Sequence, residues 1–159
     1  MTRAPTLLDP AADRPNWKAL GDRAIEKNPL LSPSFLGAAL DHLAGGHVRL
    51  AAAWRDGELA ALAPIRRVRI GGLLPAVAVW AHPYAPLGTP LLETEAAAAD
   101  LIEALDGGRQ RLLAFPFLPL DGRAARAIRT AAGASGRPVA VIAEHRRALL
   151  EREEAPDGD

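Results

Sequence analysis

A proline-rich stretch in the middle of the chain limits the folds that this sequence can adopt. It runs from His82 to Leu92 and follows an apolar segment, residues 73–81, whose pattern predicts a buried strand. Three prolines in the stretch each fix one φ angle and push the preceding residue towards an extended conformation. Gly88 supplies a freely bending position. We therefore expect a stiff, shaped connection between a strand and a following helix.

This connection also holds the candidate site residues. In α/β sheets, ligands bind beyond the carboxyl ends of strands, so we expect substrate contacts from His82, Tyr84, Gly88 and Thr89. A histidine can take a proton from a nucleophile, and a tyrosine can return one to a leaving group. The sequence fixes no carboxylate partner for either residue, so no catalytic residue is assigned. The alternatives are that both side chains only hold the loop in shape, or that the loop merely crosses a sheet edge.

Composition narrows the class of protein. The length of 159 residues predicts one domain with its own core. Nineteen basic residues balance nineteen acidic ones, so we expect no nucleic-acid partner, which would call for a basic excess. The absence of cysteine excludes disulfides and thiolate sites, and the four histidines form no i, i+4 pair, so no metal site is expected. No signal peptide and no membrane-length apolar run are visible, which predicts a cytoplasmic protein without a membrane partner.

Periodicity and turn residues predict an α/β (α+β) domain with a mixed sheet. Asp56-Gly57 is a strong hairpin signal between two apolar segments, and Gly71-Gly72 marks a second turn, so three strands should form an antiparallel meander. Ser32, Thr94 and Asp121 suit N-cap positions, and Pro116 should confine its strand to a sheet edge. The predicted order is helix 15–27, helix 33–44, strands 48–54, 58–70 and 73–81, helix 94–106, strand 112–118, helix 121–132 and strand 139–143. We expect residues 1–15 to be a flexible lead-in, 16–150 the domain, and 151–159 a disordered acidic tail.

Five segments in this order carry a resemblance. They are Asn28-Pro-Leu-Leu-Ser-Pro-Ser-Phe-Leu36, Arg55-Asp-Gly-Glu-Leu-Ala-Ala-Leu-Ala-Pro64, the loop from His82 to Leu92, Leu118-Pro-Leu-Asp-Gly122 and Glu144-His-Arg-Arg-Ala-Leu149. Together with the order of elements, they resemble the amino-terminal half of CelD/BcsL-type acyltransferases of the GNAT superfamily, which are linked by name to cellulose and exopolysaccharide biosynthesis. The resemblance covers residues 16–150. It implies a GNAT-like fold and, for the parent enzyme, acyl transfer from acetyl-CoA or another acyl-CoA to an amine.

The resemblance also implies that the two halves of the parent enzyme have different roles. Members of the family carry two GNAT-like halves, with the acyl-CoA site implied for the second, so this chain looks like a fragment, a split product or a degenerate copy. A GNAT domain grips the CoA pyrophosphate with a [Gln/Arg]-x-x-Gly-x-[Gly/Ala] turn at the start of the helix after its fourth strand. No such motif occurs at this junction here, and Glu93 and Glu95 flank the helix start, where they would repel phosphate. We therefore expect that this half binds no cofactor.

Two functional hypotheses follow. The first is a GNAT-like domain that scaffolds a catalytic half and shapes an acceptor pocket, and that is inactive alone. The second is a non-catalytic interaction module that binds a partner through its sheet edge. Residues 139–143 (Val-Ala-Val-Ile-Ala) are apolar on both faces of the predicted last strand, so the expected partner is a second GNAT-like half or another copy of the chain.

Overall fold

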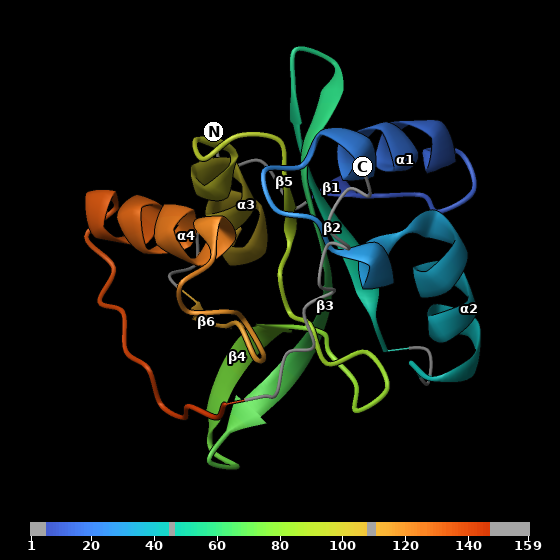
Figure 1. Ribbon diagram of the computed structural model, residues 1–159. Helices are drawn as coiled ribbons and strands as arrows, with labels where there is room; N and C mark the ends of the chain where they lie inside the picture. Colours follow the sequence, from blue (N-terminus) through green and yellow to red (C-terminus); the bar gives the residue numbers. More distant parts are fainter. Residues whose placement is uncertain (1–5, 45–46, 108–110, 147–159) are drawn as a thin grey trace, which may run out of the picture.

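The computed structural model describes residues 6–44, 47–107 and 111–146, which form a mixed sheet with helices on both faces (Figure 1). The strands lie in the order β1-β2-β3-β4-β6, and β5 pairs with β3. Their bounds are β1 Thr6–Leu7, β2 Arg49–Arg55, β3 Glu58–Ile70, β4 Leu74–Val79, β5 Leu91–Leu92 and β6 Leu112–Ala114. The helices are α1 Arg14–Arg23, the 3₁₀ turn η1 Pro29–Leu31, α2 Pro33–His42, α3 Ala97–Asp106 and α4 Arg123–Ala134. The predicted mixed α/β architecture is confirmed.

The antiparallel meander forms as predicted. β2 pairs with β3 and β3 with β4, both antiparallel. Asp56 and Gly57 at the first turn both have positive φ, 51° and 84°, which is the type I′ geometry that matches the twist of a hairpin. β6 returns parallel to β4 with α3 between them, so this pair supplies the parallel part of the sheet.

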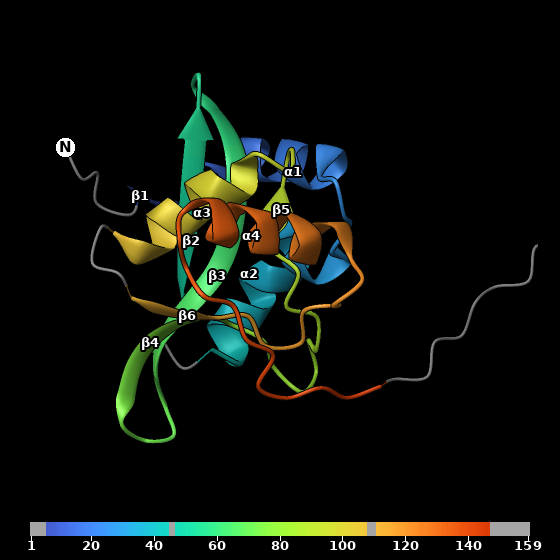
Figure 2. The same cartoon turned by 90° about the vertical axis from the view of Figure 1, so that its left-hand side faces the viewer.

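The two faces of the sheet bury different side chains. Strand residues facing α3 and α4 are mainly small, with Ala51, Ala61 and Ala63 fully buried there. The face towards α1 and α2 carries larger side chains, including Leu62 and Leu91. Figure 2, turned by 90°, shows α3 and α4 in front of the sheet. Because side chains alternate along a strand, β2, β3 and β5 each contribute to both cores.

Helix starts partly follow the sequence signals. Ser32 caps α2 as predicted, since its hydroxyl accepts a hydrogen bond from the Phe35 amide at 3.3 Å. α3 begins at Ala97, with Ala96 and not Thr94 in the N-cap position. α4 has Gly122 at its N-cap where Asp121 was expected. In both cases the predicted side chain lies just outside the helix and a turn precedes the first helical residue.

Two end segments differ from expectation. Residues 6–8 were expected in the flexible lead-in, but β1 pairs with β2, and Leu8 is buried while its amide donates to the Leu50 carbonyl. Residues 139–143 form no strand, so that prediction is wrong. Their apolar composition suits a strand, but a strand needs a paired neighbour, and β6 offers only three residues before Pro116. The predicted tail, 151–159, lies outside the described residues.

Residues 137–146 instead run past the end of the sheet as an exposed segment (Figure 2). Arg137 anchors its start by donating to the Arg111 carbonyl at 3.0 Å. His145 packs edge-on against Phe117 near its end, with ring centroids 5.3 Å apart. Between these anchors, Val141 and Ile142 are exposed. The segment therefore presents apolar side chains to its surroundings.

Candidate functional site

The proline-rich loop is an excursion within one interrupted strand. β4 and β5 both pair antiparallel with β3, at residues 65–70 and 61–62 respectively. The Trp80 amide extends the first pairing by donating to the Pro64 carbonyl at 2.7 Å, and the chain then leaves the sheet until Leu91. The loop thus leaves and rejoins the same edge of β3, as expected of a shaped connection.

Asn28, which precedes η1, holds the inner part of this loop. Its side-chain amide donates to the carbonyls of Thr89 at 2.7 Å and Leu87 at 3.3 Å. Its side-chain oxygen accepts from the Leu30 amide at 3.1 Å, so Asn28 also caps η1. Asn28 is buried, and one side chain therefore fixes both the loop and the start of the α2 region.

The loop touches the connection after β6 at Gly88. The Gly88 amide donates to the Phe117 carbonyl at 3.1 Å, and a Cβ placed on Gly88 would lie 1.8 Å from the Pro116 carbonyl oxygen. The sequence predicted a bending position here, but the need for glycine comes from close backbone approach. We call this contact of Gly88 with Pro116 and Phe117 the closed end. It joins the segments that follow the parallel strands β4 and β6.

His82 and Tyr84 lie at the outer turn of the loop. The amide and carbonyl of His82 form a bridge with those of Ala85, and the Tyr84 amide donates to His82 Nδ1 at 3.2 Å. The two rings are 5.3 Å apart, and Tyr84 is 77% exposed. Within the described residues neither side chain bonds a carboxylate. His82 thus stabilises the turn through Nδ1 and leaves its other ring nitrogen to contact a ligand.

Thr89 lies in the interior. Its side chain is fully buried, and Oγ1 has no hydrogen-bond partner among the described residues. The four predicted site residues therefore form two groups, with His82 and Tyr84 at the outer turn and Gly88 and Thr89 packed inside. They do not converge on one cavity.

Acidic side chains of the chain itself occupy the surroundings of two helix starts. Before α3, Glu93 pairs with Arg23 at 2.8 Å and Glu95 with Arg123 at 3.6 Å. At α4, the Glu26 carboxylate accepts from the Ala124 amide at 2.9 Å. A carboxylate at a helix N-terminus satisfies the unpaired amides and the positive end of the helix dipole. An incoming phosphate would compete with these groups.

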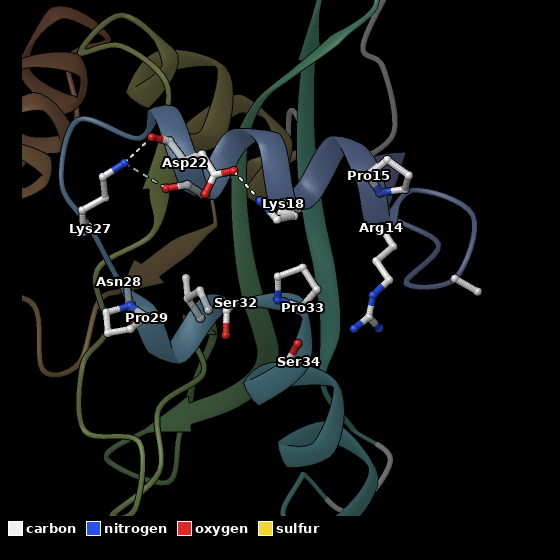
Figure 3. Close-up of a pocket in the computed structure, with 13 residues that line it drawn as sticks. Arg14, Pro15, Lys18, Asp22, Lys27, Asn28, Pro29, Ser32, Pro33 and Ser34 are labelled. Atoms are coloured by element: carbon white, nitrogen blue, oxygen red, sulfur yellow. Dashed lines mark hydrogen bonds and ion pairs between the residues drawn. The ribbon is translucent and has the colours of Figure 1, made fainter.

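An open cavity lies between α1 and the η1–α2 segment (Figure 3). Its volume is about 910 Å³, and we call it the α1–α2 cavity. Pro15, Pro29, Leu31 and Pro33 supply much of its apolar lining. None of the four predicted site residues lines it, although Asn28 does and thereby links it to the proline-rich loop.

Basic side chains outnumber acidic ones in the α1–α2 cavity. Arg14, Lys18 and Lys27 line it together with one acid, Asp22. Lys18 Nζ lies 2.7 Å from Asp22 Oδ2, and this hydrogen bond and the Lys18 charge lower the pKa of Asp22. Asp22 therefore stays ionised at neutral pH and neutralises Lys18. The positive charges of Arg14 and Lys27 remain.

Sequence reasoning missed Asn28, Glu26 and the α1–α2 cavity as features of interest. The Asn28-Pro29 pair was interpreted only as a helix stop, although an asparagine before a turn is also a capping signal. Glu26 and the cavity carry no local signal, because both depend on segments that meet only in the fold. Among the residues that the structure describes, no group of three or more metal-ligating side chains is suitably placed for an ion. In the same residues, no helix has the length and apolarity of a bilayer span.

Comparisons of the chain with protein-family models, with curated proteins and with solved structures found no match.

Proposed function

We propose that this chain is a GNAT-like domain corresponding to the amino-terminal half of a CelD/BcsL-type N-acyltransferase, and that it scaffolds a catalytic half without catalysing the reaction itself. The order α1, α2, meander, α3, β6, α4 supports the proposal, since it follows the order implied by the resemblance up to the last predicted strand. The parent reaction is acyl transfer from acetyl-CoA or another acyl-CoA to an amine. A cytoplasmic location belongs to the same proposal.

The observation that carries the non-catalytic role is the closed end. Ligands of α/β sheets bind beyond the carboxyl ends of parallel strands, where the helix starts offer free amides to phosphates. In this chain the segments after β4 and β6 contact each other there, through the Gly88 amide and the Phe117 carbonyl. At the start of α4 the Glu26 carboxylate already accepts from the Ala124 amide, whereas Glu93 and Glu95 before α3 are each paired with an arginine. Both features oppose CoA binding, so acyl-CoA is assigned to the second half.

The outer turn is the part of the loop that can meet an acceptor. Tyr84 is exposed, and the His82 ring lies near the rings of Tyr84 and Trp80, with centroid distances of 5.3 and 6.1 Å. A turn of this kind presents aromatic faces and one ring nitrogen at a fixed geometry. We assign acceptor contacts to His82 and Tyr84, and a structural role to Gly88 and Thr89.

Titration calorimetry with acetyl-CoA tests the proposal. The chain alone should show no binding, whereas a mixture with the carboxyl-terminal half of a CelD/BcsL-type enzyme should bind acyl-CoA. The double variant H82A/Y84A should leave that CoA binding unchanged and weaken acyl transfer to the amine. A 1:1 complex of acetyl-CoA with the chain alone at micromolar affinity would overturn the proposed role.

One observation favours a second candidate, a non-catalytic interaction module. Val139, Val141 and Ile142 are more than half exposed in the segment that follows α4. Exposed apolar side chains grouped on one surface are typical of a protein contact. On this alternative, the chain associates with another copy or a different protein through this surface. Light scattering coupled to size exclusion should then show an oligomer that V141K dissociates, and a monomer at tens of micromolar would contradict self-association.

A further inference from the structure

The α1–α2 cavity has the features of a ligand site, and none of its lining residues belongs to the proposed acceptor loop. Its volume of about 910 Å³ is within the range of small-molecule sites. Such sites combine an apolar lining with a few placed polar groups, and both are present here. The occupant is therefore to be inferred from the charges and their partners.

Two of the cationic side chains that line the cavity already interact with other groups of the chain. Lys18 pairs with Asp22, as described above. Lys27 Nζ donates to the backbone carbonyls of Gly21, at 3.2 Å, and Asp22, which lie in the last turn of α1. A lysine in this position interacts favourably with the negative end of the helix dipole. Neither ammonium needs a ligand to be satisfied.

Arg14 is different. Its side chain extends from the first residue of α1 towards the start of α2, where the hydroxyl of Ser34 faces it (Figure 3). Within the described part of the chain, the Arg14 guanidinium makes no hydrogen bond or ion pair, and the same holds for the Ser34 hydroxyl. Guanidinium presents a planar fork of donors that matches carboxylate and phosphate oxygens. This end of the cavity therefore favours an anionic group.

The remainder of the cavity favours an apolar body. Pro15 and Pro33 lie beside the Arg14 end, and Pro29 lies further along towards Lys27 (Figure 3). Proline rings have no side-chain donor or acceptor, so they offer nothing to a polar chain. A ligand that places an anion at Arg14 and hydrocarbon over the prolines would use both parts.

We propose that the α1–α2 cavity binds an amphiphilic organic anion, a carboxylate or phosphate on an apolar body, with its charged group at Arg14 and Ser34. A free amine is excluded from this site by the excess of positive charge. The site is thus separate from acyl transfer to an amine, and it stands whether or not the chain belongs to an acyltransferase.

Titration of the full chain, followed by the amide NMR signals of Gly21 and Ser34, tests this site. Four probes share one alkyl chain: hexanoate, hexyl phosphate, hexanol and hexylammonium. We expect at least one of the two anions to shift both signals and to bind at least tenfold more tightly than hexanol, and we expect no binding of hexylammonium. Comparison of the affinities of hexanoate and hexyl phosphate distinguishes a carboxylate ligand from a phosphate ligand. Added salt should weaken the binding of the anion, because Arg14 is exposed.

Matched variants locate the charge. R14Q should weaken the better-bound anion at least tenfold, and R14K should retain part of the affinity. R67Q, at an exposed arginine of β3, should bind as the native chain does. Equal binding of hexanol and the anions, or an unchanged affinity in R14Q, would overturn the proposal. So would inorganic phosphate binding as tightly as hexyl phosphate, which would mean an adventitious ion only.

Discussion

The two faces of the sheet differ in how completely they are sealed. On one face, α3 and α4 contact each other and lie over small strand residues such as Ala61 and Ala63. On the other, α1 and α2 cover larger residues such as Leu62, but contact each other less and leave the α1–α2 cavity between them. Small strand side chains allow helices to approach a sheet closely, and larger ones keep them further away. The two faces therefore offer different opportunities for ligands.

This difference places the open volume away from the position where ligands usually bind in α/β proteins. The carboxyl ends of the parallel strands, where ligands are expected, are closed by Gly88 against Pro116, and Glu26 occupies the start of α4. The open volume lies instead beside α1, with Arg14 at one end. In this chain, the part of the fold best suited to a small ligand is the pair of amino-terminal helices.

The largest expected effect tests the closed end. Gly88→Ala places a Cβ about 1.8 Å from a backbone oxygen, so either the loop or the segment after β6 must move. We expect the free energy of unfolding to fall by about 3 kcal/mol or more. Chemical denaturation measures it. Gly37→Ala is the matched control, because that helical glycine has open space around its Cβ, and alanine there should stabilise by about 0.5–1 kcal/mol. Equal stability of the native chain and Gly88→Ala would mean that the two loops do not touch.

A smaller effect is expected at the start of α4. Glu26→Ala removes the carboxylate that accepts from the Ala124 amide, so the free energy of unfolding should fall by about 1–2 kcal/mol, as for the loss of an N-cap. Denaturation curves of Glu26→Ala and Glu103→Ala, an exposed glutamate of α3, give the comparison. The control should change stability by less than about 0.5 kcal/mol. If both variants behave alike, Glu26 does not cap α4, and that helix start is open to a ligand.

Local signals predicted most of the fold, because they act within a few residues. Asp56-Gly57 specified a hairpin through its backbone preferences, and Ser32-Pro33 specified the start of α2. The prediction of a strand at 139–143 was wrong because a continuous apolar run indicates only that a strand is possible, whereas the sheet decides whether a partner exists. β1 was missed because two residues carry no periodicity.

The candidate site was less predictable than the fold. Gly88 was singled out from the sequence, but its role depends on Pro116, which approaches it only in three dimensions. Glu26 and Ala124 are 98 positions apart, so no local pattern joins them. Arg14 fell in the predicted lead-in, and only the position of α2 opposite it makes a cavity.

The smallest effect concerns Thr89, at the inner end of the loop. Its hydroxyl is buried and, among the described residues, unpartnered, and such a group costs free energy that the folded state does not recover. Valine has nearly the same shape without the hydroxyl, so Thr89→Val should leave the free energy of unfolding unchanged or raise it by up to about 1 kcal/mol. Thr130→Val, at an exposed position of α4, controls for the substitution itself. If the free energy of unfolding falls by about 1–3 kcal/mol in Thr89→Val but not in Thr130→Val, the Thr89 hydroxyl has a partner, such as a buried water. The interior of the loop would then be polar, and our description of it as sealed would be wrong.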